Sequence, residues 1–311
     1  MNDSPCFCED VFAVIVTYNP DLGMLHELVE ALLPQVGTAM IVDNGSVVDL
    51  TQWCKNSGHD NLILHRLASN MGIAAALNEG FSRSVASGAN FVVTFDQDSC
   101  PESDHVVSLM NHWFDLSSRS NGIEKIGAIG PSFYDGRSGN FEYPFYRANG
   151  FKVVKQYSSN DKNIVKTDAL ITSGMLVPTA MWCSGLKFNE NLFIDFVDTE
   201  WCFRSRALGY MHYGCFDVKM RHELSEASPA IFFGLIVLKY SPIRRYYHFR
   251  NCLHLIFRSY VPIAFRIRLV GGLFLRFLTV PFIDEKPYSS IKSIAAGIYD
   301  VIRGRYGRRV D

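Results

Sequence analysis

The segment Phe91-Val92-Val93-Thr94-Phe95-Asp96-Gln97-Asp98-Ser99 is an apolar run that ends abruptly in two carboxylates one residue apart. Its β-branched and aromatic residues are typical of a central strand in a parallel sheet, where both faces are buried. Ligands of open α/β sheets bind at the carboxyl ends of the strands, so Asp96 and Asp98 are predicted to lie at a binding edge. Carboxylates there suit Mg²⁺ or Mn²⁺ carrying phosphates. The alternative is a turn in which an aspartate only caps a helix near Pro101.

Three further apolar segments end in polar residues. These are residues 11–17 followed by Tyr18-Asn19, residues 39–42 followed by Asp43-Asn44, and residues 62–64 followed by Asn70-Met71-Gly72. Helical patterns separate them, which predicts βαβ units, a mostly parallel sheet and an α/β fold. A nucleotide at this edge would contact Thr17, Tyr18, Asn19 and Asn44, with Asp43 accepting from a base N–H and with Asn70 and Gly72 near phosphate at a helix start. Each group alone is also an ordinary set of turn residues.

A dinucleotide-binding fold is the rival interpretation of this strand pattern. It requires a G-x-G-x-x-G turn after the first strand, where the glycines let the backbone approach a pyrophosphate. This chain has Thr17-Tyr18-Asn19-Pro20 at that place. The sequence therefore favours a different nucleotide-binding fold.

Composition limits the class of protein and its location. The chain has 311 residues and 48% hydrophobic residues, enough for a large core. Its eight cysteines form no C-x-x-C pair, and its first residues lack the features of a signal peptide, so a cytoplasmic protein with reduced thiols is expected. The net charge of −1 conceals an asymmetry, because residues 242–311 carry thirteen Lys and Arg against four acids. That end is expected to meet an anionic partner.

The four polar clusters, taken in order, resemble the family 2 inverting glycosyltransferases with the GT-A fold. The segments that carry the resemblance are residues 14–19, 42–46, 70–74, 78–80 and 95–99. Within that family the pattern is similar to bacterial rhamnosyltransferases of polysaccharide and O-antigen assembly, over most of residues 11–260. The resemblance implies dTDP-L-rhamnose as the donor and a metal held by Asp98 with help from Asp96.

A second acidic cluster, Asp195, Asp198 and Glu200, stands ahead of a helical pattern that continues to Gly209. Acids are favoured at a helix start by the dipole alone. In the resemblance, Asp198 takes the position of the base that removes a proton from the acceptor hydroxyl. Where relatives commonly have Glu-Asp, this chain has Val197-Asp198, so a role in acceptor binding stays open for Asp195 or Glu200.

Two residues late in the chain are further candidates. His222 falls where many GT-A enzymes hold a histidine near the metal or the diphosphate, although a lone histidine is usually structural. Arg250 belongs to a Tyr-Tyr-x-x-Arg-Asn signature of the rhamnosyltransferase group, and its guanidinium would suit a phosphate. Gly174 is expected to allow a close approach to the sugar or to relieve crowding in a strand.

The sequence divides into a GT-A domain at residues 1–225 and a basic helical extension at residues 226–311. No stretch is long enough for a transmembrane helix. Phe265, Leu269, Leu273 and Phe277 form a helical stripe that is predicted to enter the cytoplasmic face of a membrane, while arginines meet lipid phosphates. The alternative is that this stripe packs against the catalytic domain or against a second subunit of a homo-oligomer. Nucleic-acid binding is not expected, because the basic residues alternate with apolar ones.

The expected function is metal-dependent transfer of L-rhamnose, with inversion, to a saccharide acceptor that is expected to be lipid-linked. Transfer of another hexose from a UDP sugar is the alternative within the enzyme class. A membrane-associated scaffold with an inactive transferase domain is the alternative outside it. Asp96, Asp98 and Asp198 are all present, which argues against an inactive domain.

Overall fold

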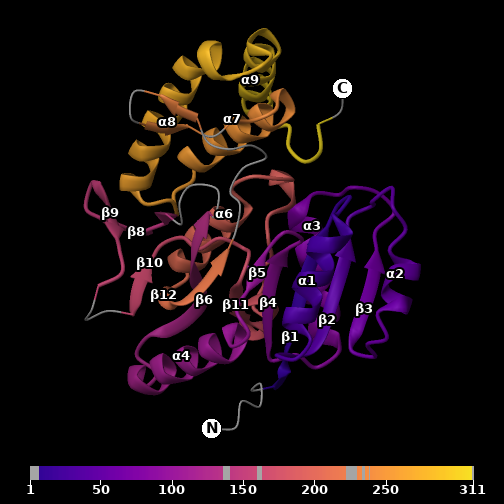
Figure 1. Ribbon diagram of the computed structural model, residues 1–311. Helices are drawn as coiled ribbons and strands as arrows, with labels where there is room; N and C mark the ends of the chain where they lie inside the picture. The colour runs from indigo at the N-terminus through magenta and orange to yellow at the C-terminus, as the bar shows by residue number, and fades with distance from the viewer. Residues whose placement is uncertain are drawn as a thin grey trace.

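A computed structural model describes residues 7–135, 141–159, 163–221, 230–232, 235–237 and 239–309. Strands alternate with helices through the first half of the chain (Figure 1). The strands are β1 Cys8–Thr17, β2 Val36–Asp43, β3 Leu62–Arg66, β4 Phe91–Asp96, β5 Cys100–Pro101, β6 Lys125–Asp135, β7 Phe141–Glu142, β8 Phe145–Asn149, β9 Lys152–Gln156, β10 Ile164–Thr167, β11 Met175–Pro178, β12 Tyr210–Arg221, β13 Ala230–Phe232 and β14 Leu235–Val237. The helices are α1 Leu22–Leu32, α2 Thr51–Asn56, α3 Ile73–Ala86, α4 His105–Ser120, α5 Thr179–Cys183, the 3-10 turn η2 Glu190–Leu192, α6 Val197–Ala207, α7 Pro242–Ile256, α8 Ile263–Ile283 and α9 Pro287–Ile302.

One large sheet forms the centre of the molecule, with the strand order β10-β12-β6-β11-β4-β1-β2-β3. Strands β4, β1, β2 and β3 are mutually parallel, and β6 is parallel to β12. Strand β11 runs antiparallel to β4 and β6 and joins the two parallel groups. These pairings confirm the α/β class and the mostly parallel sheet.

The two faces of the sheet take alternate residues of each strand, because successive side chains of a strand point in opposite directions. In β1, Val14 and Val16 pack into the core that contains α3 and α6, whereas Ala13 and Ile15 pack into the core that contains α1 and α4. Helices therefore cover both faces. The strand ends are left as the place where polar groups gather.

The described C-terminal part begins with the β13–β14 hairpin, which precedes the predicted helices. The predicted boundary at residue 225 lies outside the described residues. Helices α7, α8 and α9 then gather at the end of the sheet where β1, β2 and β3 finish (Figure 1). Asn251 of α7 bonds to backbone carbonyls of the loop before α6, so the helices are in contact with that end.

The face that α8 presents to solvent differs from the predicted one. Phe265 and Leu273 are buried, and Leu269 packs beside them, so this part of the predicted lipid-facing stripe turns toward the protein. The alternative, packing on the catalytic domain, is correct for Phe265, which contacts Phe203 of α6, whereas Leu273 packs in a cluster with residues of α7 and α9. A different face of α8 is exposed, and it contains Ile263, Ile267, Val270, Phe274, Leu278 and Phe282.

Candidate functional site

The strand register brings the predicted nucleotide-binding residues to one edge of the sheet. Thr17 at the end of β1 lies opposite Asp43 of β2, and Asp43 lies opposite Arg66 of β3. On the other side of β1, Asp96 pairs with Val16, one residue before Thr17. Residues that are up to 79 positions apart in the sequence thus form a row across the carboxyl ends of four strands.

Asp43 is the most buried carboxylate of this row. Its Oδ1 accepts hydrogen bonds from the hydroxyls of Thr17 and Ser46 and from the Ser46 N–H. Its Oδ2 is buried and accepts no hydrogen bond within the described part of the chain, although Arg66 Nε lies 3.5 Å away. A buried acceptor without a donor is costly unless a ligand supplies one. The geometry leaves this oxygen able to accept one N–H.

The turns after β1 and β2 hold each other in place. The Asn19 N–H donates to Ser46 Oγ at 2.7 Å, and Asn19 Oδ1 accepts from the Val47 N–H at 2.9 Å. The Tyr18 N–H donates to Gln97 Oε1 at 2.7 Å, which ties the same turn to the Asp96–Asp98 segment. The Tyr18 ring is 47% exposed, so it is free to cover a ligand at this edge.

Asn44, Asn70 and Gly72 join β2 to the start of α3. Asn44 Oδ1 accepts from the Met71 N–H at 2.8 Å, and Asn44 Nδ2 donates to Asn70 Oδ1 at 3.2 Å. Gly72 has a φ of 89°, and a Cβ there would come within 2.6 Å of the Phe193 carbonyl oxygen. The N–H groups of Gly72 and Ile73 already bond to Asn70 and Phe193. Gly72 therefore serves a close contact between segments, and these two amides do not face a phosphate.

Asp96 and Asp98 are half-buried at the end of β4. The Asp96 N–H donates to Ser173 Oγ at 3.2 Å, and Ser173 Oγ also bonds to Ser99 Oγ. Gly174 has a φ of 77°, and a Cβ there would lie 2.7 Å from the ring of Pro131, so crowding explains this glycine. Carboxylate oxygens of this kind are hard ligands, and Mg²⁺ typically uses one or two of them together with substrate phosphates. The two aspartates fit such a cation.

Asp198, in the first turn of α6, faces the end of β4. Its Oδ1 accepts from the Thr199 N–H at 2.6 Å and from Thr199 Oγ1 at 3.1 Å. The pKa of Asp198 is raised to about 6, first by burial and then by the negative charges of Asp96 and Asp195, against the two hydrogen bonds from Thr199. The structure thus brings the two acidic clusters of the sequence together. A carboxylate with a pKa near 6 suits proton removal at neutral pH.

The two acids beside Asp198 have different surroundings. Glu200 is 1% exposed, pairs with Arg204 at 2.8 Å and accepts from Tyr260 Oη at 2.7 Å. Its bonds link α6 to the segment before α8, which is a structural role. Asp195 accepts from Arg244 Nη2 at 3.2 Å and has a φ of 62°. A positive φ in a residue other than glycine is strained and is common at functional sites, so the role in acceptor binding stays a prediction for Asp195.

Arg250 does not face the strand ends, which corrects its predicted role. It is 1% exposed, and its Nη2 donates to the carbonyls of Asn191 and Leu192 at 3.0 and 2.9 Å. Its Nη1 donates to the Gly307 carbonyl at 2.6 Å. The guanidinium is hydrogen-bonded to backbone oxygens and links the segment at residues 191–192 to the segment at residue 307. The sequence signature is the same whether its arginine binds phosphate or is buried in the protein. Only the tertiary structure distinguishes the two cases.

His222 lies outside the described residues. The preceding residue, Arg221, pairs with Cys100, two residues after Asp98. Sequence reasoning did not single out Arg66, Ser46 or Gln97, which all bond to the predicted edge. Ser46 lies in residues 42–46, one of the segments that carry the family resemblance, and Arg66 is the last residue of a strand. Their positions in the sequence could therefore have indicated a place at this edge.

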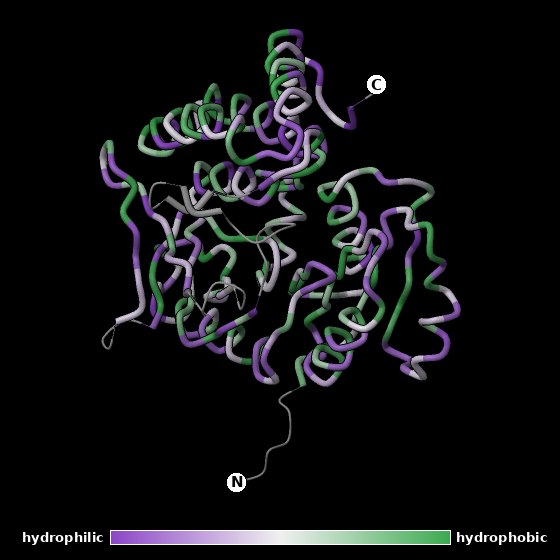
Figure 2. The backbone as a smooth tube through the Cα atoms, turned by 45° about the horizontal axis from the view of Figure 1, so that its top comes forward, coloured by the Kyte–Doolittle hydropathy of each residue, from purple (hydrophilic) through white to green (hydrophobic). Residues whose placement is uncertain are grey.

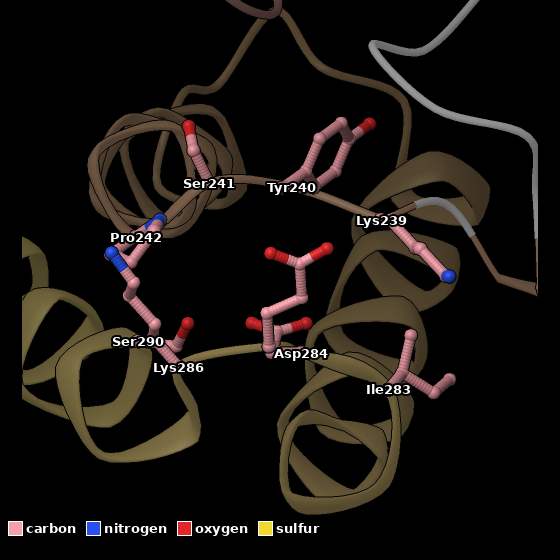
Figure 3. A pocket seen from close by; sticks show the side chains of 9 residues that line it. Lys239, Tyr240, Ser241, Pro242, Ile283, Asp284, Lys286 and Ser290 are labelled. Atoms are coloured by element: carbon pink, nitrogen blue, oxygen red, sulfur yellow. The ribbon is translucent and has the colours of Figure 1, made fainter.

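Two other features lie away from this edge. A cavity of about 270 Å³ lies between the start of α7, the end of α8 and the start of α9 (Figure 3). Asp284 lines it across from Tyr240 and Ser241, and is held there by a buried ion pair with Arg245. Among the described residues, His112, Cys215 and Asp217 lie close enough to share a cation. The hydrogen bond between His112 Nε2 and Asp217 Oδ2 at 2.9 Å and the raised pKa of the buried Cys215 thiol explain that group without one.

Known proteins resemble this chain in sequence over most of its length. The profile of the glycosyl transferase family 2 matches residues 12–164, which include the row from Thr17 to Asp96. The dTDP-rhamnosyl transferase RfbF of Shigella flexneri is 31% identical over 300 residues, which cover 96% of this chain and 97% of that protein. The likeness therefore includes α6 and the C-terminal helices.

Solved structures share the fold at low sequence identity. A structure of S. aureus TarS in complex with UDP-GlcNAc is 13% identical, with a TM-score of 0.53, over 94% of this chain and 81% of that one. GalNAc-T7 with UDP, GalNAc and Mn²⁺ is 11% identical, with a TM-score of 0.57, over 95% of this chain and 58% of that one. These likenesses place the chain in the GT-A fold.

Proposed function

The chain belongs to family 2 of the glycosyl transferases, and from that premise we propose that it transfers L-rhamnose from dTDP-L-rhamnose to a saccharide acceptor, with inversion. The rhamnosyl specificity is supported by the 31% identity to a dTDP-rhamnosyl transferase over nearly the whole chain. The observation that carries the chemistry is the approach of Asp198, with its raised pKa, to the Asp96 end of β4. The product belongs in cell-surface polysaccharide.

The donor base is proposed to lie between the turns after β1 and β2. The Oδ2 of Asp43, which accepts no hydrogen bond within the described residues, would accept the single N–H of a thymine ring, while the exposed ring of Tyr18 covers the base. Uracil offers the same N–H, so this contact serves UDP sugars as well. The discrimination between the two nucleotides has to be measured.

Asp96 and Asp98 are proposed to hold Mg²⁺ or Mn²⁺. When bound, the cation would neutralise the charge that develops on the leaving diphosphate. The negative charge of Asp96 already acts on Asp198, so the carboxylates at this place repel one another and favour a cation. His222 is proposed as a third ligand from its place in the sequence. It lies outside the described residues.

Asp198 is proposed to be the general base. Its carboxylate takes the proton of an acceptor hydroxyl as that oxygen bonds to the anomeric carbon, and the bond from this carbon to the diphosphate breaks. The products are a rhamnoside of inverted configuration and dTDP. The hydrogen bonds from Thr199 fix the direction of the carboxylate, which leaves its other oxygen for the acceptor.

A donor panel tests the proposal. Purified protein is incubated with dTDP-L-rhamnose, dTDP-glucose, UDP-glucose or UDP-GlcNAc, with a mixture of saccharide acceptors and with Mg²⁺, Mn²⁺ or EDTA. Nucleotide release above the rate of the Asp198→Asn variant is expected only with dTDP-L-rhamnose and a metal. Turnover of a UDP sugar, with none of dTDP-L-rhamnose, supports the alternative donor. Full turnover in EDTA contradicts the proposed role of the metal. If no donor releases nucleotide, the inactive scaffold is favoured.

We also propose that helices α8 and α9 rest on an anionic membrane surface. Within the described residues, no helix has the length and apolar content needed to span a bilayer. The exposed part of α8 carries apolar side chains from Ile263 to Phe282 together with Arg268, and α9 exposes Ile291, Ile298 and Ile302. Figure 2 shows hydrophobic residues recurring along both helices. Thirteen Lys and Arg follow residue 241, so phospholipid headgroups complement this part of the chain.

Sedimentation with vesicles tests this contact. Wild-type protein should co-sediment with vesicles of phosphatidylglycerol and phosphatidylcholine, and less so at high salt, because salt screens surface charges. The double variant Phe274→Ser, Phe282→Ser should lose this binding, whereas Phe151→Ser, a change of an equally exposed phenylalanine on the β8–β9 turn, should keep it. Equal binding by all three proteins would contradict the α8 assignment and point to a second subunit or another surface.

A further inference from the structure

The segment after α9 turns back toward the sheet and is held there by defined contacts. The Gly307 N–H donates to the Asn191 carbonyl at 2.7 Å, and the Gly307 carbonyl accepts from Arg250 at 2.6 Å. Two residues later, the Arg309 N–H donates to Tyr247 Oη at 2.8 Å. Figure 1 shows this segment coming down from α9 toward α3. Residues 303–309 are therefore fixed at the end of the sheet where the donor is proposed to bind.

Arg308 stands between these two anchored residues. Its side chain is exposed, and its Nη1 lies 3.5 Å from the carbonyl oxygen of Asn70. The side chain of Asn70 in turn bonds to Asn44, the neighbour of Asp43 in β2. In the part of the chain that the structure describes, Arg308 has no carboxylate partner, whereas Arg305 lies 3.9 Å from Asp300. The fold holds a charged guanidinium against the nucleotide edge and leaves most of its N–H donors unused.

Three amide groups at the start of α3 are not free for the phosphate contact that was predicted at this place. Helix starts commonly bind phosphate through free amide groups. Here the Met71, Gly72 and Ile73 amides bond to Asn44, Asn70 and Phe193. A diphosphate near Asn70 thus needs another source of positive charge, and a planar guanidinium matches phosphate oxygens with two parallel N–H bonds.

We propose that the segment after α9 completes the donor site through one residue, Arg308, which binds the diphosphate of the nucleotide sugar. This inference rests on the proposed function, because it assigns a contact within the same donor site. Arg250, which was predicted for this contact, instead positions Arg308, because it donates a hydrogen bond to the carbonyl of the preceding residue, Gly307. The C-terminal segment would then bind the donor as well as join α9 to the sheet.

The test compares a nucleoside with its diphosphate. Thymidine and dTDP are titrated, by ligand-observed NMR and by calorimetry, into wild-type protein, Arg308→Gln and the matched control Arg305→Gln. Loss of a charge-assisted bond should weaken dTDP binding by roughly tenfold or more in Arg308→Gln. Thymidine binding should stay unchanged, and Arg305→Gln should bind both ligands like the wild type. The Arg308→Lys variant should recover part of the dTDP affinity.

The outcomes separate this inference from the function on which it rests. If wild-type protein binds dTDP but Arg308→Gln binds it within twofold of the wild type, the assignment of Arg308 is overturned while the donor proposal stands. An equal loss for thymidine and dTDP would overturn it too, because it would indicate a change in the whole site. If the wild type binds neither ligand, the thymidine donor itself is wrong, and the inference falls with it.

Discussion

The carboxyl edge of the sheet and helix α7 both carry polar side chains, but the bonds of these side chains differ. At the edge, Asp43 has a buried oxygen without a hydrogen bond, and Asp198 has a pKa raised to about 6. In α7, Arg250 and Asn251 are equally buried, but they donate to backbone carbonyls of residues 191–195 and 307. The edge thus has a polar atom that can still bond to a ligand. The polar groups of α7 are instead bonded to other segments of the chain.

This difference teaches which polar residues act on substrate and which position them. A buried polar group that is fully bonded stabilises the fold, and its loss leaves its partners unsatisfied. A group with unused capacity costs stability and is retained for another reason. Substitutions in the two regions are therefore expected to affect different measurements. The predictions below test that separation.

The largest effect is expected for Asp198→Asn at the edge. The amide cannot take a proton, so kcat should fall by roughly 10²-fold or more, which is the usual range for loss of a general base. Donor affinity should stay nearly unchanged, as measured by calorimetry with dTDP. Asp217→Asn, on the exposed end of β12, is the control and should keep the wild-type kcat. A collapse of donor affinity in Asp198→Asn would make this residue a binding or folding group.

The next effect is expected for Arg250→Leu in α7, and it should appear in stability. The substitution removes the guanidinium hydrogen bonds to the carbonyls of Asn191, Leu192 and Gly307, at a cost of about 3 kcal/mol or more in the free energy of unfolding. Urea unfolding measures it. Arg258→Leu is the control at the exposed end of the same helix region and should change stability by less than about 0.5 kcal/mol. Equal stability of the two variants would mean that α7 does not hold these segments.

Much of the fold and of the edge follows from the sequence. The segments at residues 11–17, 39–42, 62–64 and 91–95 are all strands, because their apolar pattern and the polar turns after them agree. The register then places Thr17, Asp43 and Asp96 in one row, as parallel strands require. Local chemistry and global fold point to the same arrangement there.

The C-terminal part was predicted less well, because its faces depend on packing. Phe265 and Leu273 repeat at helical spacing, and that spacing does not tell whether lipid or protein covers them. Arg250 and Arg308 both lie in the basic C-terminal part of the chain, and only the tertiary structure shows that the first is buried and the second is exposed. Contacts between residues that are 57 or more positions apart leave no signal in a single sequence.

A smaller effect is expected in the pH dependence of the rate. Asp198 must be ionised to accept a proton, so kcat/KM should fall as the pH drops through about 6, approaching tenfold for each unit below it. A pH profile between 4.5 and 8.5 measures this, with circular dichroism at each pH to exclude unfolding. An unperturbed aspartate would keep the rate level down to about pH 4. A level profile at pH 5 would therefore contradict the raised pKa.

The smallest expected effect concerns stability at the edge, and it has the opposite sign to the Arg250 prediction. The pKa of Asp198 is about 6 in the folded protein and 3.8 in its ordinary range, so the folded state binds the proton more tightly. Ionised Asp198 therefore destabilises the fold as the pH rises from about 4 through about 6. Asparagine removes that charge, so Asp198→Asn should raise the melting temperature by roughly 2 to 4 °C at pH 8 and by less at pH 5. The stability gain should appear in the variant that loses kcat, because the same buried charge causes both. Equal melting temperatures of the two proteins at pH 8 would show that Asp198 carries no such cost, and the contrast between the edge and α7 would then rest on Asp43 alone.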